Sequence, residues 1–382
     1  MTLHHFSFPT AITFGGGARF ETAAALARNH LGRVLIITDR GVAVLPLFGE
    51  YVTACRAGGV VVAVYDGVAG NPTSLHVEQG VAAYRETAAQ AIIGIGGGAA
   101  LDVAKAVALM VDHPGGIFDY EDGRADARLV TGTIPYLILL PTTAGTGSEV
   151  GRSAVISDPD THVKRIIFSP RLLAREVFAD PELTLALPPG ITAATGMDAL
   201  THCVEAFLAR DWHPICDGVA LEGLHLAAGS LLRCYRDGAD GEARSQMLMA
   251  SMMGAISFQK GLGVTHSCAH ALSALANMHH GLANAVMIDH ALVHNLAAVP
   301  ERFQRLAQAA GVAGGGPAFL AWLTTLKAGL GIPATLAAAG IDRGLEERLV
   351  AAALADSCHQ SNPVPCGPAD LRVIFRRAFG ER

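Results

Sequence analysis

Charged side chains are scarce in this sequence. Asp, Glu, Lys and Arg together make up 16% of the 382 residues, the formal net charge is −6, and Lys and Arg nowhere form a block. Proteins that bind nucleic acid or anionic membranes usually carry a concentrated basic patch. The sequence therefore predicts neither partner and favours a small-molecule substrate.

The cysteines do not form a recognisable framework. The chain has seven of them, an odd number, and none is arranged as CxxC. This pattern argues against a set of disulfides and favours free thiols in a reducing compartment. The start, MTLHHFSFPT, also lacks a basic segment followed by an apolar one, so no secretory signal is expected and we predict a cytoplasmic protein.

Apolar residues, in contrast, are abundant. They make up 51% of a chain whose length suggests two domains, which is more apolar surface than a monomer of this size usually hides. We therefore expect a homodimer or higher homo-oligomer. Two long stretches, 129–148 and 261–288, have no charge, but one contains two prolines and the other four histidines, so neither suits a membrane span.

The order of apolar runs predicts two kinds of architecture. Short β-rich runs alternate with helical stretches in the first half, at 33–39, 59–67, 88–98 and 135–143. Such runs are typical of parallel strands covered on both faces, so we expect a Rossmann-like α/β domain. The second half has helical periodicity throughout and is expected to be all-α. Pro181, Pro188 and Pro189 break the chain between them, and we predict domains at 1–186 and 187–382.

Two glycine-containing loops follow expected strands. In AIIGIGGGAALDVAKAVALM, residues Gly96, Gly97 and Gly98 join a strand to a helix, where backbone N–H groups and the helix N-terminus favour a phosphate. The spacing is not GxGxxG, and a plain turn is the alternative. The second loop, PTTAGTGSEV at 141–150, carries hydroxyls that can contact phosphate and ribose oxygens. Together the loops predict a dinucleotide cofactor.

Asp39 closes the expected strand RVLIITD. A carboxylate at this position can accept hydrogen bonds from a ribose diol and repels a 2′-phosphate, so NAD is expected rather than NADP. An equally simple interpretation is an Asp that begins a turn before Arg40 and Gly41.

The stretch GMDALTHCVEAFLA places Asp198 and His202 four residues apart on one face of an apolar helix. His266 and His270 form a similar pair in GLGVTHSCAHALSALANMHHGLANAV. His280 would lie about 21 Å from His266 in one continuous helix, so it can join them only if the helix ends first. Asn277 and Gly281 are suitable terminating residues.

A buried carboxylate among several neutral imidazoles satisfies its partners around a divalent ion, and this donor set suits Fe²⁺ or Zn²⁺. A hydrogen-bonded core histidine is the alternative for any single member. Because five such groups occur in two nearly uncharged segments, we favour the metal site.

These motifs taken together resemble the iron-containing (group III) alcohol dehydrogenase family along essentially the whole chain. The residues that carry the likeness are GGGAALDVAKA, PTTAGTGSEV, TGMDALTHCVEA and the histidine-rich segment that begins at Gly261. The resemblance implies a dehydroquinate synthase-like fold with an N-terminal NAD-binding α/β domain and a C-terminal helical domain that holds Fe²⁺, or alternatively Zn²⁺, together with the substrate.

The resemblance also implies individual roles. It implies metal ligands at Asp198, His202, His266 and His280. His270 is then not a ligand but a candidate proton carrier near the metal. On the cofactor side it implies Asp39 and Asn71 near the adenosine, Gly97 and Gly98 at the pyrophosphate, Thr142 and Thr143 at phosphate and ribose, and Lys164 beside the cofactor.

We therefore expect an NAD-dependent, metal-dependent alcohol dehydrogenase or aldehyde reductase that acts on a small primary alcohol or diol. An anionic substrate such as 4-hydroxybutyrate is the alternative, because Arg152, Lys164 and Lys260 fall in or beside the motifs. Chemistry like that of maleylacetate reductase is a further alternative. A non-redox lyase of the dehydroquinate synthase type would need a cluster of Lys and Arg that the sequence lacks. At Ala99, Gly151 and Arg152 the chain departs from the family's usual residues, which leaves the substrate open.

Overall fold

The computed structural model describes residue 8, residues 10–161 and residues 163–381. These residues fall into two compact units. The sheet unit comprises the described residues up to 143 and those from 147 to 184, and the helical unit comprises 144–146 and the described residues from 185 onward. The domain limits 1–186 and 187–382 stay a prediction.

The sheet unit contains one six-stranded sheet in which every pair of neighbours is parallel. Its order is β1 (Ala11–Phe14), β8 (Glu176–Ala179), β5 (Tyr136–Pro141), β4 (Ala91–Gly96), β2 (Arg33–Asp39) and β3 (Val61–Val68). The four predicted strands are thus confirmed. The sequence analysis missed β1 and β8, which have only four residues each and too little periodicity to be recognised.

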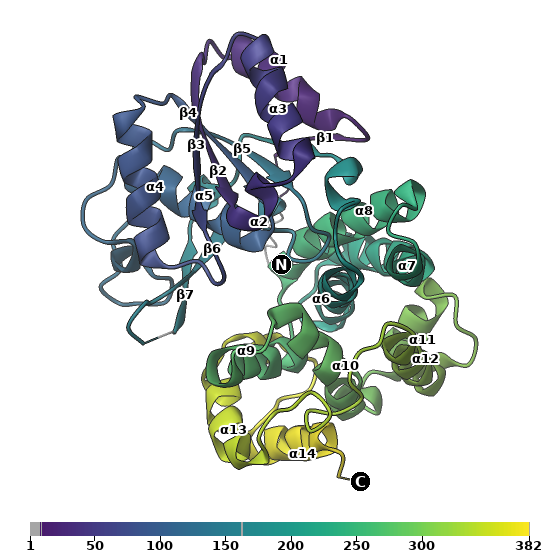
Figure 1. The fold of residues 1–382 in the computed structure, drawn as a ribbon. Helices are drawn as coiled ribbons and strands as arrows, with labels where there is room; N and C mark the ends of the chain where they lie inside the picture. The colour runs from purple at the N-terminus through teal and green to yellow at the C-terminus, as the bar shows by residue number, and fades with distance from the viewer. Residues whose placement is uncertain (1–7, 9, 162, 382) are drawn as a thin grey trace, which may run out of the picture. The chain divides into compact units, whose positions relative to one another are not determined.

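Helices cover both faces of this sheet (Figure 1). The side chains of Val34, Ile36, Ile93 and Ile95 pack under α1 (Thr22–Arg28) and α3 (Pro46–Ala57). On the other side lie α4 (Ser74–Glu86) and α5 (Gly98–Met110), and α5 is buried along nearly its whole length. Strands buried on both faces have no polar side to show, which is why they are continuous apolar runs in the sequence.

The chain changes direction in the middle of the sheet. From β2 it continues to β3 on one side, whereas from β4 it continues to β5 on the other side. The loops that follow β2 and β4 therefore lead away from each other at the carboxyl edge of two neighbouring strands. Such a switch point is where open α/β sheets bind their ligands.

A two-stranded antiparallel hairpin, β6 (Ser153–Ser157) and β7 (Lys164–Phe168), is attached to this unit. It was not expected from the sequence. Asp102 on α5 accepts a hydrogen bond from the backbone N–H of Val155 at 3.0 Å, and the buried Lys105 donates to the backbone carbonyls of Ser148 and Ser153. Asp102 and Lys105, the two charged residues of the DVAK segment, therefore hold the hairpin against α5.

The described residues from 185 to 381 contain helices and no strand, which confirms the all-α prediction for the second half. Pro188 and Pro189 stand before and at the first position of the long central helix, where proline costs nothing. The helices are α6 (Pro189–Leu208), α7 (Pro214–Arg236), α8 (Gly241–Ser257), α9 (Val264–Ala276), α10 (His280–Leu296), α11 (Pro300–Ala309), α12 (Gly315–Gly329), α13 (Glu346–Ala355) and α14 (Pro368–Phe379).

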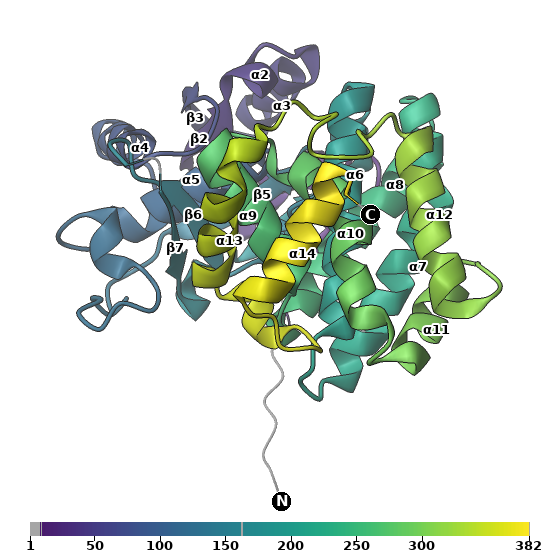
Figure 2. The same ribbon diagram turned by 90° about the horizontal axis from the view of Figure 1, so that it is seen from below.

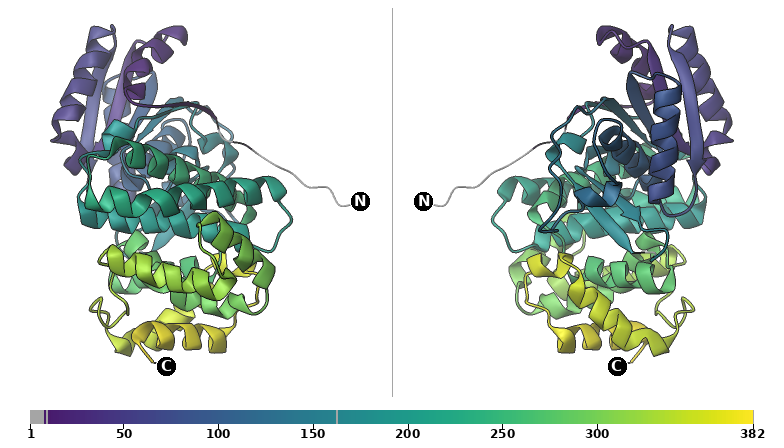
Figure 3. Two further views of the ribbon diagram at one scale, coloured as in Figure 1. Left: turned by 90° about the vertical axis from the view of Figure 1, so that its right-hand side faces the viewer. Right: turned by 90° about the vertical axis from the view of Figure 1, so that its left-hand side faces the viewer.

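Two groups of helices pack around α6 and α10. Helices α6, α7 and α8 contact one another, and α9, α10, α13 and α14 form a second group, as Figure 2 shows. Helices α6 and α10 join the two groups by direct contact. The same helices, teal to yellow, are seen from two further sides in Figure 3. Almost every residue of α6 from Thr192 onward is buried, so a polar residue on it must find its partner inside the protein.

Among the described residues, one helix has the length and apolar composition of a membrane span, namely α7. Core helices of soluble proteins pass the same test, and α7 contacts both α6 and α8. Near its start, Asp217 is paired with Lys260 and Arg302. This helix is thus part of the packing of the helical unit.

A sharp turn joins α9 to α10, as the sequence predicts for His280. Helix α9 ends at Ala276, the next residue Asn277 has a φ of 51° in the left-handed region, and α10 begins at His280. Gly281 does not terminate a helix, contrary to expectation. A Cβ atom on Gly281 would lie 2.3 Å from the backbone oxygen of Ala194, so this glycine lets α10 approach α6 closely.

We predict that Gly281→Ala destabilises the protein, because the added methyl group forces α10 away from α6. Overpacking of this kind costs about 1–3 kcal/mol. Thermal or denaturant unfolding measures the effect. The control is Gly229→Ala on the exposed side of α7, where a Cβ atom meets nothing within 4 Å and the helix gains stability from the better propensity of Ala. Equal stability of the two variants would contradict the close packing.

Candidate functional site

Four side chains of the helical unit converge at one point. Asp198 and His202 come from α6, His266 from α9 and His280 from the first position of α10, and their ligand atoms all lie within 4.8 Å of one another. Asp198 Oδ1 is 3.9 Å from the Nε2 atom of His202, 3.8 Å from that of His266 and 3.4 Å from that of His280. The structure thus brings together the four residues that the resemblance names, and it places His280 in the cluster.

Burial and charge give two of these groups, Asp198 and His202, the protonation states that a cation needs. Burial raises the pKa of Asp198, but His202, His280, His266 and a hydrogen bond from Asn284 together outweigh it and lower the pKa to about 2. Burial lowers the pKa of His202 to about 4, although Asp198 opposes this shift. At neutral pH the cluster therefore offers a carboxylate and a neutral imidazole, both of which are donors for a divalent ion.

Glu205, one further turn along α6, is a part of the site that the sequence analysis missed. Its buried carboxylate lies 2.7 Å from His266 Nδ1 and accepts hydrogen bonds from the backbone N–H groups of Gly263, Thr265 and His266 at 2.7–3.2 Å. One side chain of α6 thus caps the N-terminus of α9, where a negative charge is favourable. It also fixes the His266 ring so that Nε2 faces Asp198.

Gly263 makes this cap possible. A Cβ atom at this position would lie 2.7 Å from Glu205 Oε1 and 3.0 Å from Asn362 Oδ1, so only glycine allows the carboxylate to approach. A signal for Glu205 was present in the sequence, since it is three residues after His202 and seven after Asp198 and so shares their helical face.

His270, the predicted proton carrier, lies beside the cluster but is not a member of it. Its ring is stacked on that of His280, with the centroids 5.1 Å apart. Its Nδ1 atom lies 2.7 Å from Asp356 Oδ2, and the other carboxylate oxygen accepts hydrogen bonds from Ser267 Oγ and the backbone N–H of Cys358. Asp356 therefore favours the tautomer of His270 with the proton on Nδ1 and leaves Nε2 as the basic atom.

The pKa of the Asp356 carboxyl is well below its ordinary value. Burial raises it, but the hydrogen bond and charge of His270, together with Ser267 and Cys358, outweigh this effect. Nothing in the sequence pointed to Asp356, because it lies 86 residues from His270 in a segment between α13 and a short 3₁₀ helix.

The sheet unit gathers the predicted cofactor residues at one edge. Asp39, Gly97 and Thr142 follow or close the neighbouring parallel strands β2, β4 and β5 at their carboxyl ends. Thr142 donates its backbone N–H to the Gly96 carbonyl at 2.9 Å, and a Cβ atom on Gly97 would lie 3.3 Å from the Thr143 side chain. Gly98 begins α5, so the N-terminus of a 13-residue helix points toward this edge.

Asp39 begins a turn, as the simpler interpretation of the sequence predicts, and one of its carboxylate oxygens still faces the glycine turn. Its Oδ1 atom caps the short helix α2 (Arg40–Ala43) by accepting a hydrogen bond from Val42 N–H at 3.0 Å. Its Oδ2 atom faces the glycine turn, 2.9 Å from where a Cβ atom on Gly96 would stand. Gly96 itself has a φ of 153°, which together with this contact explains why glycine is required there.

Asn71 and Lys164 lie at the same edge, near the end of β3. Asn71 is exposed in the loop that follows β3, and the next residue, Pro72, accepts a hydrogen bond from the backbone N–H of Ser157 at 2.7 Å. Ser157 pairs with Lys164 in the hairpin. The hairpin therefore brings Lys164, which is far from Asn71 in the sequence, to the same part of the sheet unit.

Lys260, a residue considered for binding an anionic substrate, is engaged elsewhere. It is buried, and its Nζ atom lies 2.5 Å from Asp217 Oδ1 and 2.9 Å from the Phe207 carbonyl oxygen. Its charge is paired with Asp217 inside the helical unit, so the structure gives Lys260 a role in the packing of the helices.

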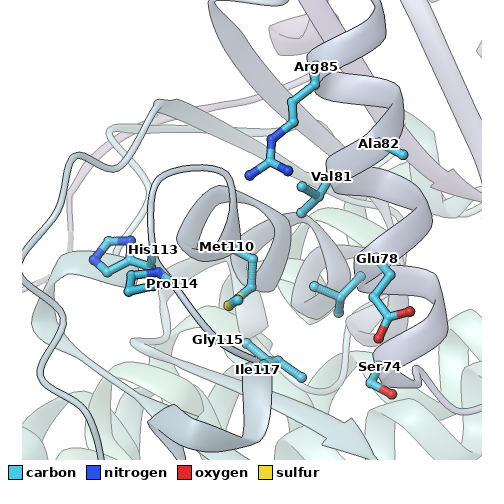
Figure 4. Close-up of a pocket in the computed structure, with 12 residues that line it drawn as sticks. Ser74, Glu78, Val81, Ala82, Arg85, Met110, His113, Pro114, Gly115 and Ile117 are labelled. Carbon is cyan, nitrogen blue, oxygen red and sulfur yellow. The ribbon is translucent and has the colours of Figure 1, made fainter.

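The sheet unit also has a hollow at the opposite end of α5 from the glycine turn (Figure 4). It lies between α4 and the segment after α5 and is lined by residues that include Glu78, Arg85 and His113. His113 is occupied at both ring nitrogens, by the Leu109 carbonyl and the Gly132 N–H, and Arg85 donates to the Val111 carbonyl. These contacts of His113 and Arg85 serve the fold, and no predicted site residue lines the hollow.

The glycine turn and the N-terminus of α5, at the carboxyl edge of the sheet, suit the phosphates of a dinucleotide. The carboxylate and imidazole cluster of the helical unit suits a metal ion. The two features together are typical of an oxidoreductase that uses a dinucleotide and a metal. The comparisons with known proteins support this class. Residues 9–181 match the family model "Iron-containing alcohol dehydrogenase", and residues 192–379 match "Fe-containing alcohol dehydrogenase family, C-terminal". The chain belongs to the iron-containing alcohol dehydrogenase family.

Individual relatives agree along nearly their whole length. The chain is 39% identical to 4-hydroxybutyrate dehydrogenase of Cupriavidus necator, covering 92% of this chain and 94% of the relative. It is 34% identical to 1,3-propanediol dehydrogenase of Klebsiella pneumoniae, covering 91% of each. A crystal structure of 1,3-propanediol oxidoreductase superimposes with a TM-score of 0.94 at 33% identity, covering 98% of this chain and 100% of that one. The predicted family, fold and alcohol dehydrogenase activity on a small molecule are therefore confirmed.

We predict that Glu205→Gln weakens the metal site. A glutamine keeps one carbonyl oxygen, but its NH₂ group would face the N–H groups at the start of α9, so His266 loses its fixed orientation. Loss of such a partner typically costs about 10- to 100-fold in metal affinity. Chelator competition on the purified protein measures it. Glu222→Gln, an exposed change on α7, is the control. Unchanged affinity in Glu205→Gln would contradict this role.

Proposed function

We propose that this alcohol dehydrogenase uses NAD and one divalent ion, Fe²⁺ with Zn²⁺ as the alternative, and that Asp198, His202, His266 and His280 hold the ion. The observation that carries the proposal is the convergence of these four ligand atoms within 4.8 Å in a family described as iron-containing. One carboxylate and three imidazoles without a thiolate suit Fe²⁺ or Zn²⁺. When bound, the ion supplies Lewis acidity toward the oxygen of an alcohol or aldehyde.

For the cofactor we propose the carboxyl edge of the sheet. The backbone N–H groups of Gly97 and Gly98 and the N-terminus of α5 favour the pyrophosphate. The side chain of Thr143 lies beside the same turn, and Thr142 is joined to it through its backbone N–H, so we assign both threonines to phosphate and ribose. We assign Asp39 and Asn71 to the adenosine part of the cofactor, and we place Lys164 beside the cofactor without assigning it to one of its groups. The carboxylate of Asp39 favours NAD, because a 2′-phosphate beside it is repelled.

His270 is proposed to receive the hydroxyl proton of the alcohol. Asp356 holds the proton on Nδ1, so Nε2 is the acceptor, and the half-buried ring can pass the proton to solvent. In aldehyde reduction the same ring returns the proton. Asp356 thus supports the tautomer that makes this transfer possible in both directions.

We propose a small primary alcohol or diol as the substrate, with a hydroxy acid as the second candidate. The names of two relatives, 1,3-propanediol dehydrogenase and 4-hydroxybutyrate dehydrogenase, support the diol and the hydroxy acid respectively. Lys260 is buried in an ion pair with Asp217, so for a carboxylate we propose Arg152 and Lys164, the other two cations in or beside the motifs. A homo-oligomer and a cytoplasmic location stay predictions.

The test is NADH formation with a panel of primary alcohols, 1,3-propanediol and 4-hydroxybutyrate, measured on protein loaded with Fe²⁺ or Zn²⁺ and again after chelation. We predict that His266→Ala loses most bound metal and nearly all activity but retains NAD binding in a calorimetric titration. His225→Ala, an exposed change on α7, serves as the control. Full activity of His266→Ala, or of the chelated wild type, would exclude the proposed metal site.

For the cofactor preference we predict that Asp39→Asn improves the use of NADP relative to NAD. Asparagine keeps an oxygen that can cap α2 but removes the charge, and one unit charge at about 4 Å in water is worth about 1 kcal/mol, or roughly fivefold. The ratio of kcat/KM for the two cofactors is the measurement. An unchanged ratio in a variant with wild-type stability would argue against the ribose role of Asp39.

A further inference from the structure

A second group of metal-type donors lies at the opposite end of α10 from His280. His294 in the last turn of α10, Cys366 in the loop before α14 and Asp370 in the first turn of α14 offer ligand atoms that all lie within 4.8 Å of one another. His294 follows His280 by 14 residues in the same helix, or about 21 Å at about 1.5 Å per residue. The group is therefore separate from the cluster of α6, α9 and α10, which we call the first cluster.

The loop that carries Cys366 is held against α10 by a buried pair of carboxamides. Asn295, the neighbour of His294, and Asn362 each donate Nδ2 to the Oδ1 atom of the other, at 3.0 and 2.7 Å. Asn362 Nδ2 also donates to the carbonyl of Val364 at 2.7 Å. The backbone of the loop is further restricted by prolines at positions 363, 365 and 368. The place of Cys366 beside α10 is therefore set by the fold, before any ion binds.

Each of the three donors is positioned by the fold and can still bind an ion. Asp370 accepts a hydrogen bond from the backbone N–H of Gly367 at 2.9 Å through Oδ2, which leaves Oδ1 for another partner. The ring of His294 lies with Nε2 3.3 Å from the carbonyl oxygen of Pro365, the residue before Cys366. Cys366 itself is a buried free cysteine.

The chemistry of this group differs from that of the first cluster. It combines a thiol with an imidazole and a carboxylate, and a thiolate ligand favours Zn²⁺ over harder ions. Ligand atoms about 2.0–2.3 Å from a tetrahedral zinc ion lie about 3.3–3.7 Å apart. Because the three donors are already within 4.8 Å of one another, small rotations of the partly exposed His294 and Asp370 side chains bring them to one ion. Three protein ligands leave the fourth position for water.

We propose that His294, Cys366 and Asp370 form a second metal site, selective for Zn²⁺, which fastens α14 to the C-terminal end of α10. These two helices are in contact, as Figure 2 shows. The C-terminus of α10 favours a cation, and the N-terminus of α14 favours the anionic ligands. When Zn²⁺ binds, the thiol proton passes to solvent and a bond between sulfur and zinc forms.

The site has a structural consequence for the first cluster. An ion that binds only the folded arrangement stabilises it by mass action. Helix α10 begins with His280, so an ion at its other end stabilises the helix that presents this histidine to the first cluster. The two sites share no residue, and the second site does not depend on the proposed function.

Cobalt substitution tests the site in the full-length protein, because a thiolate bound to Co²⁺ gives an intense charge-transfer band in the near ultraviolet. The first cluster contains no cysteine and cannot give this band. We expect the band to appear when Co²⁺ is added to the wild type and to disappear when Zn²⁺ is then added in competition. We expect no band in Cys366→Ser.

Two further cysteine variants show which thiol gives the band. Cys234→Ser removes a buried cysteine of α7 that is in none of the donor groups of the described residues, and it should keep the band. Cys358→Ser removes the thiol beside His270 and Asp356, which form another group of possible donors, and it should also keep the band. Zn²⁺ should raise the melting temperature of Cys234→Ser by more than that of Cys366→Ser.

His294→Ala and Asp370→Asn test the other two ligands and leave the thiol in place. Loss of an outer-shell partner alone typically costs about 10- to 100-fold in metal affinity, so loss of a ligand should weaken Co²⁺ binding at least about tenfold. The affinity is read from a Co²⁺ titration followed at the charge-transfer band. Asp370→Asn keeps an oxygen that can accept the Gly367 N–H, so the start of α14 remains capped.

Three results would overturn the proposal. They are the absence of the band in the wild type at saturating Co²⁺, a band that persists in Cys366→Ser, and unchanged affinity in both His294→Ala and Asp370→Asn. If Cys366→Ser does not fold, the histidine and aspartate variants decide. Loss of alcohol dehydrogenase activity after chelation concerns the first cluster, whereas the band reports only a site with a thiolate, so the two failures are distinguishable.

Discussion

The carboxylate of Glu205 connects the two helices on which the candidate metal site depends. Its partners are the backbone N–H groups at the start of α9 and the Nδ1 atom of His266, and none of them is accessible to water. Burial raises the pKa of Glu205, but the contacts with His266 and Thr265 lower it by more, so the net pKa is below its ordinary value. The group therefore remains an anion inside the protein. A buried anion with this many donors fixes both the position of α9 and the direction of an imidazole.

A second histidine beside the cluster is oriented by a carboxylate in the same way. Asp356 determines the tautomer of His270 as Glu205 does that of His266, and in both pairs the carboxylate comes from a different helix or segment than the histidine. Close packing is the second requirement. Gly281 lets α10 meet α6, and Gly263 lets Glu205 meet α9, so two glycines set the distance between the elements that carry the ligands.

Much of this could be predicted from particular residues. Strands such as RVLIITD are continuous apolar runs because both of their faces are buried, and the spacing of Asp198 and His202 indicates one helical face whatever surrounds it. The prolines before α6 marked its start. The short strands β1 and β8 could not be recognised, because four residues carry too little pattern, and the hairpin of β6 and β7 is held by α5 rather than by its own propensity.

The sequence by itself determined the types of element, the glycine turn after β4 and the presence of a carboxylate and imidazoles on two apolar helices, because these depend on local periodicity and chemistry. Only the tertiary structure decided which groups meet. In the folded protein Asp356, Glu205 and Asn284 contact the histidines or the carboxylate of the site, whereas Lys260 forms an ion pair with Asp217. Contacts between residues far apart in the chain follow from how helices pack, and no spacing within one segment records them.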